Sequence, residues 1–280
     1  MSDLPFADQH VVVTGGGTGM GRAAALAFAG LGAASVIITG RREHRLAEVA
    51  SLDPVIVPVR ADVTTRDGAD AVAAAVSARG GRLDVLVHNA GVYRMTPIDG
   101  FDIALAREML ETNVVGPVLL TTRLLPMMRA PGGSIVIVSS VAGHNPEPQA
   151  SVYAASKAGL HSLTITWARE LASRGIRVNA VAPSAIRTEV FATNGFSEAD
   201  VDTLFEKFAS INPLGRTGTV DDVTPWITKL AEPASSWVTG QIISIDGGAD
   251  LTSASDSLFL QWDDSSWGED SGSWQEKAEA

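Results

Sequence analysis

The sequence lacks several features that would place it in particular classes of protein. It has no cysteine, which excludes disulfides, a thiolate nucleophile and cysteine-ligated metal sites. Its longest apolar runs are strand-sized, far below the roughly 20 residues that a membrane-spanning helix needs. The opening MSDLPFADQH has neither the basic flank nor the apolar core of a signal peptide. We therefore expect a protein of the reducing cytoplasm with no membrane partner.

Basic residues are outnumbered by acidic ones. The net charge is -11, and residues 250–280 hold eight acids but a single base, Lys277. An acidic surface disfavours nucleic acids and anionic membranes, because both attract basic patches. We expect residues 250–280 to form a separate acidic tail that is partly disordered or docked on a neighbouring subunit.

Short β-branched runs recur along the chain with alanine-rich segments between them. The runs lie at 10–14, 35–39, 54–58, 84–88, 134–139, 176–181 and 241–245. Apolar character that is continuous rather than alternating is typical of strands buried on both faces. Residues 1–249 therefore predict one α/β domain, a doubly wound, seven-stranded parallel sheet with helices on both faces.

A glycine-rich stretch, TGGGTGMG at 14–21, follows the first predicted strand and opens the first predicted helix. Glycines there let the backbone approach a pyrophosphate, and the free N–H groups of a helix N-terminus attract the anion. The residues that we expect to contact a dinucleotide are Gly15, Gly17, Thr18, Gly19, Met20 and Gly21. The alternative is a glycine turn that only closes the corner between strand and helix.

Four motifs follow one another in order: GxxxGxG at 15–21, HNAG at 88–91, Tyr153-x-x-x-Lys157 and RVNAVAP at 177–183. With them, residues 8 to 249 resemble the short-chain dehydrogenase/reductase family. The resemblance implies a Rossmann-type fold with strand order 3-2-1-4-5-6-7 and a nicotinamide cofactor. It implies further cofactor contacts at Asp62, Val63, Asn89, Ala90, Gly91, Pro183, Ile186 and Thr188, with Asn89 mainly structural. Ser184 departs from the family, which has glycine there.

The end of the second predicted strand bears on the choice of nicotinamide cofactor. A carboxylate there would bind the ribose 2′-OH of NAD, but this strand ends in Gly40, followed by Arg41 and Arg42. Arginine suits a phosphate through its planar, permanently charged fork. We therefore expect NADP(H), with Glu43 as the only acid nearby. The alternative is that both arginines only cap and solvate the next helix.

Tyr153 and Lys157 are four residues apart with small side chains between them. On a helix they share one face. A nearby ammonium favours phenolate, so we expect Lys157 to lower the pKa of Tyr153 from about 10 and let it exchange a proton near neutral pH. The resemblance implies that Lys157 also hydrogen-bonds the nicotinamide ribose.

The resemblance adds two catalytic residues, Asn113 and Ser140. Ser140, rather than its neighbour Ser139, matches the family's carbonyl-orienting serine. Asn113 matches an asparagine that binds a water and links the lysine to solvent; otherwise it is a polar helix residue that bonds the backbone. The resemblance implies reversible hydride transfer between the nicotinamide and a carbonyl carbon. Because NADPH normally serves as a reductant in metabolism, we expect reduction of a ketone, with Tyr153 as general acid. Alcohol oxidation, epimerase or dehydratase chemistry on the same tetrad, and a non-catalytic dinucleotide sensor or scaffold remain alternatives.

The motifs identify fewer of the residues that contact the substrate. We expect Tyr93, Met95, His144, Asn145 and Phe191 to line the substrate cleft, with residues 189–212 as a lid. His144 alternatively caps a loop, and the lid's aromatic residues alternatively belong to the core. The five histidines show no metal-ligand spacing. The resemblance implies a small-molecule carbonyl or alcohol substrate and a homotetramer or homodimer built through the helices that hold Asn113 and Tyr153.

Overall fold

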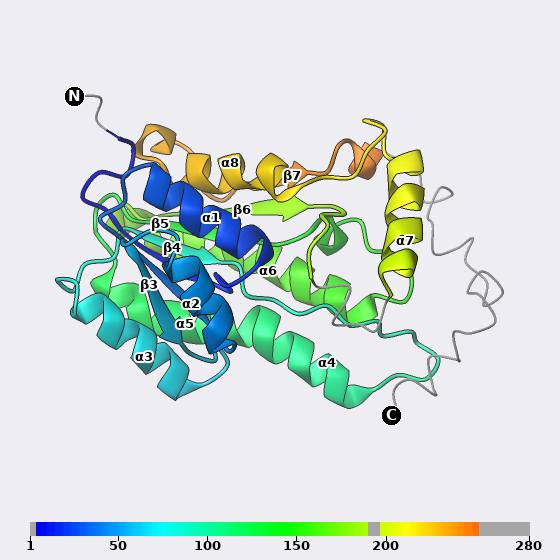
Figure 1. The fold of residues 1–280 in the computed structure, drawn as a ribbon, viewed down its shortest axis with the longest axis horizontal. Coiled ribbons are helices and arrows are strands. Elements are labelled where there is room, and N and C mark those ends of the chain that lie inside the picture. The colour runs from blue at the N-terminus through cyan, green and yellow to red at the C-terminus, as the bar shows by residue number, and fades with distance from the viewer. Residues whose placement is uncertain (1–3, 190–196, 252–280) are drawn as a thin grey trace.

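The computed structural model describes residues 4–189 and 197–251, and its centre is one parallel β-sheet (Figure 1). The seven strands lie in the order β3-β2-β1-β4-β5-β6-β7, which confirms the predicted order. In chain order they are β1 His10–Thr14, β2 Ser35–Gly40, β3 Ile56–Arg60, β4 Val85–His88, β5 Ser134–Val138, β6 Arg177–Pro183 and β7 Ile242–Ile245.

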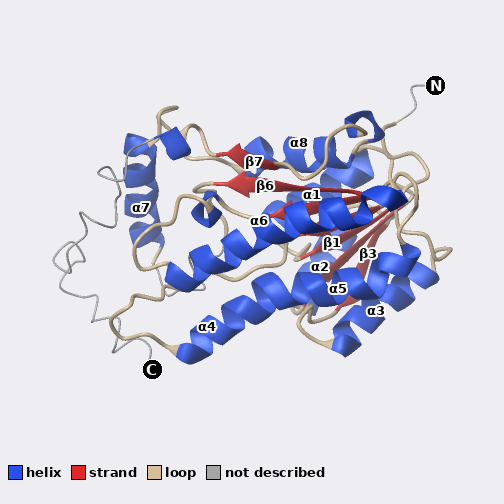
Figure 2. Cartoon of the chain, turned by 180° about the vertical axis from the view of Figure 1, so that it is seen from behind, coloured by secondary structure: helices blue, strands red, loops and turns tan. Residues whose placement is uncertain are grey.

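Helices cover both faces of this sheet (Figure 2). One face packs against α1 (Gly19–Gly30), α2 (Glu43–Ala50) and α8 (Val220–Ala231). The other packs against α3 (Arg66–Ser77), α5 (Gly116–Leu124) and α6 (Ser151–Leu171). The remaining helices are α4 (Ile103–Leu110) and α7 (Glu198–Ile211). No helix within 4–189 or 197–251 is long and apolar enough to cross a membrane.

The first strand shows why the apolar runs are continuous. Val11 and Val13 point into the core under α1 and α8, whereas Val12 points into the core on the opposite face. All three side chains are fully buried. Because both faces are covered, every position of the strand favours an apolar residue.

The chain reverses its direction across the sheet between β1 and β4, which are neighbours although two strands separate them in sequence. Connections from their carboxyl ends diverge to opposite sides at such a point, and the crevice left between them is the usual ligand site of an open α/β sheet. The glycine-rich turn after β1 and the HNAG segment after β4 therefore lie side by side.

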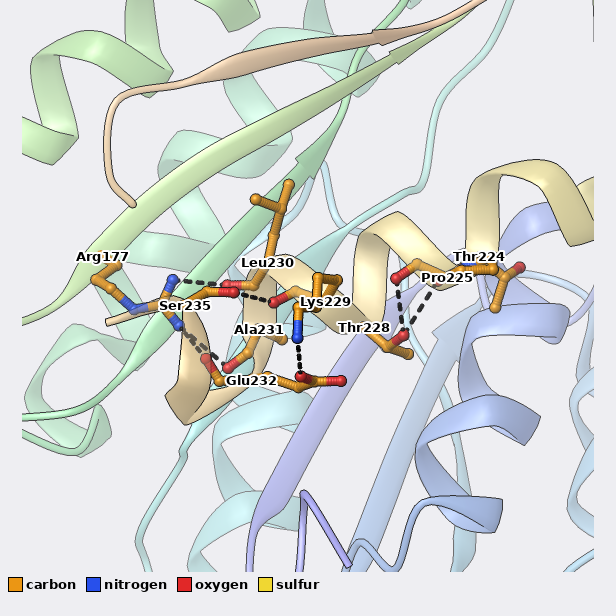
Figure 3. Close-up of polar contacts among 9 residues, drawn as sticks. All are labelled: Arg177, Thr224, Pro225, Thr228, Lys229, Leu230, Ala231, Glu232 and Ser235. Atoms are coloured by element: carbon orange, nitrogen blue, oxygen red, sulfur yellow. Dashed lines mark hydrogen bonds and ion pairs between the residues drawn. The ribbon is translucent and has the colours of Figure 1, made fainter. Parts of the chain in front are cut away.

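Arg177, at the start of β6, joins the sheet to the end of α8 (Figure 3). Its guanidinium donates hydrogen bonds to the carbonyl oxygens of Leu230 at 2.6 Å and of Ala231 and Glu232, both at 3.1 Å. The last carbonyl groups of a helix have no partner within it, so this buried cation supplies one.

Some boundaries differ from the sequence prediction. β3 begins at Ile56, two residues later than predicted, because Asp53 starts a turn: its carboxylate accepts from Val55 N at 3.0 Å and its carbonyl accepts from Ile56 N at 3.1 Å. Within the predicted lid, α7 buries Leu204 and Phe205, which places these two apolar side chains in packing contacts. Phe191 and the tail after Leu251 lie outside the described residues.

Candidate active site

The glycine-rich turn between β1 and α1 brings backbone segments closer than side chains would allow. A Cβ on Gly21 would lie 2.3 Å from Gly15 O and 2.4 Å from Asn89 Nδ2. Gly15 itself has φ +66° and Gly19 has φ +53°, a left-handed conformation that glycine adopts without strain. The turn therefore packs the start of α1 tightly against β1 and leaves its N–H groups facing the crevice.

Thr14 and Asn89 hold this turn against the segment after β4. Thr14 Oγ1 accepts hydrogen bonds from the backbone N–H groups of Asn89 and Ala90, both at 2.9 Å. The Asn89 amide donates to Thr14 O at 2.9 Å and Gly15 O at 3.2 Å. The mainly structural role expected for Asn89 agrees with these bonds.

A cleft with a cavity volume of about 440 Å³ runs from this turn to α6. Most of the residues predicted to bind a cofactor line it: Gly15, Gly17, Thr18, Gly19, Met20, Arg41, Arg42, Asp62, Val63, Asn89, Ala90, Gly91, Tyr153, Lys157 and Thr188. Tyr93, predicted on the substrate side, lines it too. Gly21 lies beneath the turn, and Ile186 is buried in the core with its Cδ1 against Gly218.

The end of the cleft beside α2 contains an acid that the sequence analysis overlooked. Glu189 forms ion pairs with Arg42 at 3.0 Å and with Arg45 at 3.2 Å. The expectation that Glu43 is the only acid near the arginines was therefore wrong. Glu189 could not be foreseen because it lies 147 positions from Arg42 in the chain. Arg45 was also missed, although its position one turn along α2 from Arg41 and Arg42 was a usable signal.

Asp62 lies in the same part of the cleft and is held in place by Thr64. Its Oδ1 accepts from Thr64 N at 3.0 Å and from Thr64 Oγ1 at 2.8 Å. Burial acts to raise the pKa of Asp62, but these hydrogen bonds and the nearby charge of Arg41 outweigh it and lower the pKa. Asp62 is therefore a fixed, ionised acceptor at neutral pH.

At the other end of the cleft, one turn of α6 brings Tyr153 and Lys157 together. Lys157 Nζ lies 5.5 Å from the centroid of the Tyr153 ring and donates to Val138 O at 3.2 Å. The Tyr93 ring meets the Tyr153 ring edge to face, with centroids 4.9 Å apart. The predicted sharing of one helix face is thus confirmed, and Tyr93 shields the pair from one side.

The expected lowering of the pKa of Tyr153 by Lys157 was wrong. Burial raises the pKa of Tyr153, and a hydrogen bond with Ser140 offsets this only in part. Burial also lowers the pKa of Lys157 to about 8, which still leaves the amine mostly charged at pH 7. Tyr153 therefore holds its proton at neutral pH, as a proton donor must.

Two neighbouring serines follow β5, and their contacts differ. The Ser140 side chain acts to lower the pKa of Tyr153, and its Oγ accepts from Ala142 N at 3.2 Å, which begins a 3-10 turn at Val141–Gly143. Ser139 is buried and donates to the backbone carbonyl of Lys157 at 3.3 Å. The effect on the tyrosine therefore comes from Ser140.

Asn113 is fully buried in a π-helical turn, Glu111–Val115, between α4 and α5. Its Oδ1 accepts from Val92 N at 2.8 Å, and its Nδ2 donates to Val92 O at 2.9 Å and Ser156 Oγ at 3.0 Å. Single π-helical turns occur frequently at functional sites. Asn113 thus connects the segment after β4 to α6 beside Lys157.

Comparisons with known proteins agree with this arrangement. A family model described as Enoyl-(Acyl carrier protein) reductase matches residues 15–250. The chain belongs to the short-chain dehydrogenase/reductase family. It is 39% identical over 245 residues to the 3-oxoacyl-[acyl-carrier-protein] reductase FabG of Thermotoga maritima, covering 85% of this chain and 96% of that protein. As a member of this family the chain is an oxidoreductase.

Two further relatives show the range of the short-chain dehydrogenase/reductase family. Cis-4-hydroxycyclohexanecarboxylate dehydrogenase of Sinomonas cyclohexanicum is 37% identical over 247 residues, covering 87% of this chain and 97% of that protein. A Caenorhabditis elegans short-chain dehydrogenase/reductase of unknown function, solved with cofactor, superposes with a TM-score of 0.84 at 33% identity, covering 90% of this chain and 99% of that one.

The residues of this short-chain dehydrogenase/reductase fit a dinucleotide. The glycine cradle would be filled by any Cβ at Gly21, and the N-terminus of α1 faces the cleft. Arginines lie at one end and the Tyr153–Lys157 pair at the other. Within the described part of the chain, no group of three His, Asp or Glu side chains could hold a metal ion.

Several predicted substrate-side residues lie outside the cleft lining. His144 pairs with Asp250 through Nε2 and Oδ2 at 2.6 Å, which ties the turn after Ser140 to the last described helical turn. Met95 is partly buried, and Asn145 donates its backbone N–H to Val141 O. Pro183, which was predicted as a cofactor contact, also lies outside the lining and is buried at the end of β6.

His161, which the sequence analysis did not single out, supports the Ser140 turn from below. Its ring packs so closely on Gly143 that a Cβ there would lie 2.5 Å from Cε1. Burial, with smaller contributions from His144 and Lys157, lowers the pKa of His161 to about 4. The usable signal was its position two helical turns after Tyr153, on the same face.

Proposed function

We propose that this protein is an NADPH-dependent reductase that converts a ketone to a secondary alcohol. The observation that carries the proposal is the placing of Tyr153, with Lys157 Nζ 5.5 Å from its ring centroid, in the same cleft as the glycine turn. A proton donor and a dinucleotide cradle in one cavity suit hydride addition to a carbonyl group better than the other chemistries of this fold.

In this reaction the bound cofactor supplies the hydride. Tyr153 donates its proton to the carbonyl oxygen, and the Ser140 hydroxyl stabilises the negative charge that grows there. Lys157, mostly charged at neutral pH, lies beside the ring and supports proton return to Tyr153. Asn113 holds the segment 91–92 and the helix that carries Lys157 at a constant separation.

The preference for NADP(H) rests on the arginines at the other end. Gly40 offers no carboxylate for a ribose 2′-OH, and Arg41, Arg42 and Arg45 line this part of the cleft. Guanidinium groups bind phosphate through paired, charge-assisted hydrogen bonds. We assign the 2′-phosphate to Arg42 and Arg45 because both already hold an oxyanion, the Glu189 carboxylate.

For the substrate we propose a small-molecule ketone of the secondary-metabolite or acyl type. The relative from Thermotoga maritima is named for a 3-oxoacyl substrate and covers nearly the whole chain. The Tyr93 ring packs edge to face with the Tyr153 ring, which would select against bulk on that side of the tyrosine.

Oxidation of an alcohol in the reverse direction is a second candidate. The relative from Sinomonas cyclohexanicum is named as a dehydrogenase, and Glu189 places a carboxylate at the adenosine end of the cleft. NAD(H) would be the cofactor expected with that carboxylate bound to a ribose hydroxyl.

The test is turnover of a panel of ketones with NADPH and of the matching alcohols with NADP and NAD. We expect ketone reduction with NADPH to be fastest, and Tyr153→Phe to lower kcat by about 10² to 10⁴-fold while the Kd for NADPH stays within about twofold. Faster alcohol oxidation with NAD would establish the second candidate instead. Tight NADPH binding without turnover of any carbonyl would indicate a sensor.

We further propose a homo-oligomer whose subunits meet across α5 and α6. Val115 and Val118, before and within α5, and Ile165 on α6 leave 38–42% of their surfaces exposed. Apolar side chains grouped on adjacent helices are typical of a subunit interface. Light scattering should give a dimer or tetramer for the wild type, and Val118→Glu with Ile165→Glu should give a monomer that retains its helical circular dichroism.

A further inference from the structure

The Glu189 carboxylate occupies a position between two arginines of α2 and its N-cap. Oε2 lies 3.0 Å from Arg42 Nη1, and Oε1 lies 3.2 Å from Arg45 Nη2. Both oxygens are therefore engaged, one by each guanidinium. This is the arrangement in which two arginines hold a phosphate group through separate oxygens.

The same residues belong to the cofactor cleft. Arg42 also donates to Thr18 Oγ1 at 3.4 Å, and Thr18 is the N-cap of α1. A Cβ on Gly19 would lie 3.2 Å from Thr188 Cγ2, so Thr188 and Glu189 lie directly over the glycine turn. Glu189 thus stands at the adenosine end of the cleft, where a 2′-phosphate would have to approach Arg42 and Arg45.

The two ion pairs are exposed enough to be exchanged. The side chains of Arg42, Glu189 and Arg45 remain 50%, 42% and 37% accessible. Exposed pairs contribute little each, so a dianionic phosphate can displace a single carboxylate. The displacement nevertheless reduces the free energy gained on binding.

We propose that Glu189 is a specificity-determining residue that competes with the 2′-phosphate of NADP(H) for Arg42 and Arg45. The competition reduces the difference in binding affinity between NADP(H) and NAD(H), because only the phosphorylated cofactor has to displace the carboxylate. This inference rests on the proposed function, since it requires that the cleft binds a nicotinamide dinucleotide with the arginines at the phosphate.

The experiment compares Glu189→Gln with Glu48→Gln in the full-length chain. Glutamine keeps the size of each side chain and removes its charge. Glu48 is the matched control because it pairs with Arg45 at 3.2 Å but belongs to α2 and makes no pair with Arg42. Fluorescence titration measures the Kd of each protein for NADPH and for NADH, with adenosine 2′,5′-bisphosphate as a probe of the phosphate site alone.

We expect Glu189→Gln to bind NADPH and the bisphosphate about three- to tenfold more tightly, which is the range that two exposed ion pairs allow. Its Kd for NADH and both Kd values of Glu48→Gln should stay within about twofold of wild type. The gain in affinity of Glu189→Gln for NADPH should shrink in 1 M salt, which screens exposed charges. It should also shrink in an Arg42→Ala background, which removes one ion pair.

Two results would overturn the inference. If Glu189→Gln leaves the Kd for NADPH unchanged, the carboxylate does not compete. If Glu189→Gln instead binds NADH more weakly than wild type, Glu189 is a ligand of the ribose hydroxyls. In both cases dinucleotide binding by the wild type still stands, whereas a wild type that binds neither cofactor refutes the proposed function as well.

Discussion

Arg177 allows the contribution of one buried side chain to be worked out from its contacts. Arg177 is only 9% exposed, and its guanidinium donates to three successive carbonyl groups at the end of α8, Leu230, Ala231 and Glu232 (Figure 3). Arg177→Met keeps the length of the aliphatic stem and removes all of these hydrogen bonds.

The expected loss of stability is about 3 kcal/mol. Each hydrogen bond to a charged group contributes roughly 1.5–3 kcal/mol, but the sum over three overstates the effect, because the variant no longer has to bury a cation. For a chain of this size, about 3 kcal/mol corresponds to a fall in Tm of roughly 6–12 °C.

Urea unfolding at fixed protein concentration measures this loss, with Lys229→Met as control. Lys229 pairs with Glu232 at 2.8 Å at the same helix end, but its side chain is 57% exposed. An exposed pair contributes at most about 1 kcal/mol. Equal losses for the two variants, or a loss under about 1 kcal/mol for Arg177→Met, would refute the view that burial gives these hydrogen bonds their strength.

Three further predictions concern the cleft. Gly21→Ala should lower stability by about 1–3 kcal/mol in thermal melts, since its Cβ would strike Gly15 O, whereas Gly30→Ala at the open end of the same helix should raise it slightly. Thr14→Val should cost about 1–3 kcal/mol in urea by leaving two N–H groups unpaired. Burial holds the pKa of Lys157 at about 8 instead of 10.5, so its unfavourable charge burial is fully present below pH 8 and is lost by pH 10.5. At pH 7 the free energy of unfolding of Lys157→Met should therefore exceed that of wild type by about 1–3 kcal/mol. A difference in unfolding free energy that does not shrink as the pH rises to 10.5 would contradict this.

Features that depend on near neighbours in the chain could be predicted from the sequence. The continuous apolar run of β1 reflects burial on both faces, and both faces are covered. The spacing of Tyr153 and Lys157 places them on one face of α6 because a helix has fixed geometry. Where boundaries moved, as in β3, a single turn-forming side chain, Asp53, was the reason.

Features that depend on distant residues could not be predicted. Glu189 reaches Arg42 across 147 residues, and this contact leaves no local pattern in the sequence. The pKa of Tyr153 has the opposite direction from the one that its neighbour Lys157 suggested. Charge attraction can be anticipated from sequence spacing, but desolvation depends on every atom packed around a group.

The sequence by itself determined the strand and helix types, the glycine turn and the tyrosine–lysine pair, because these follow from hydrogen-bond geometry and steric limits within a few residues. Tertiary structure decided which acid faces the arginines and in which direction the pKa of the tyrosine shifts. Those properties arise from electrostatics and burial, which act through space between segments that only the folded sheet brings together.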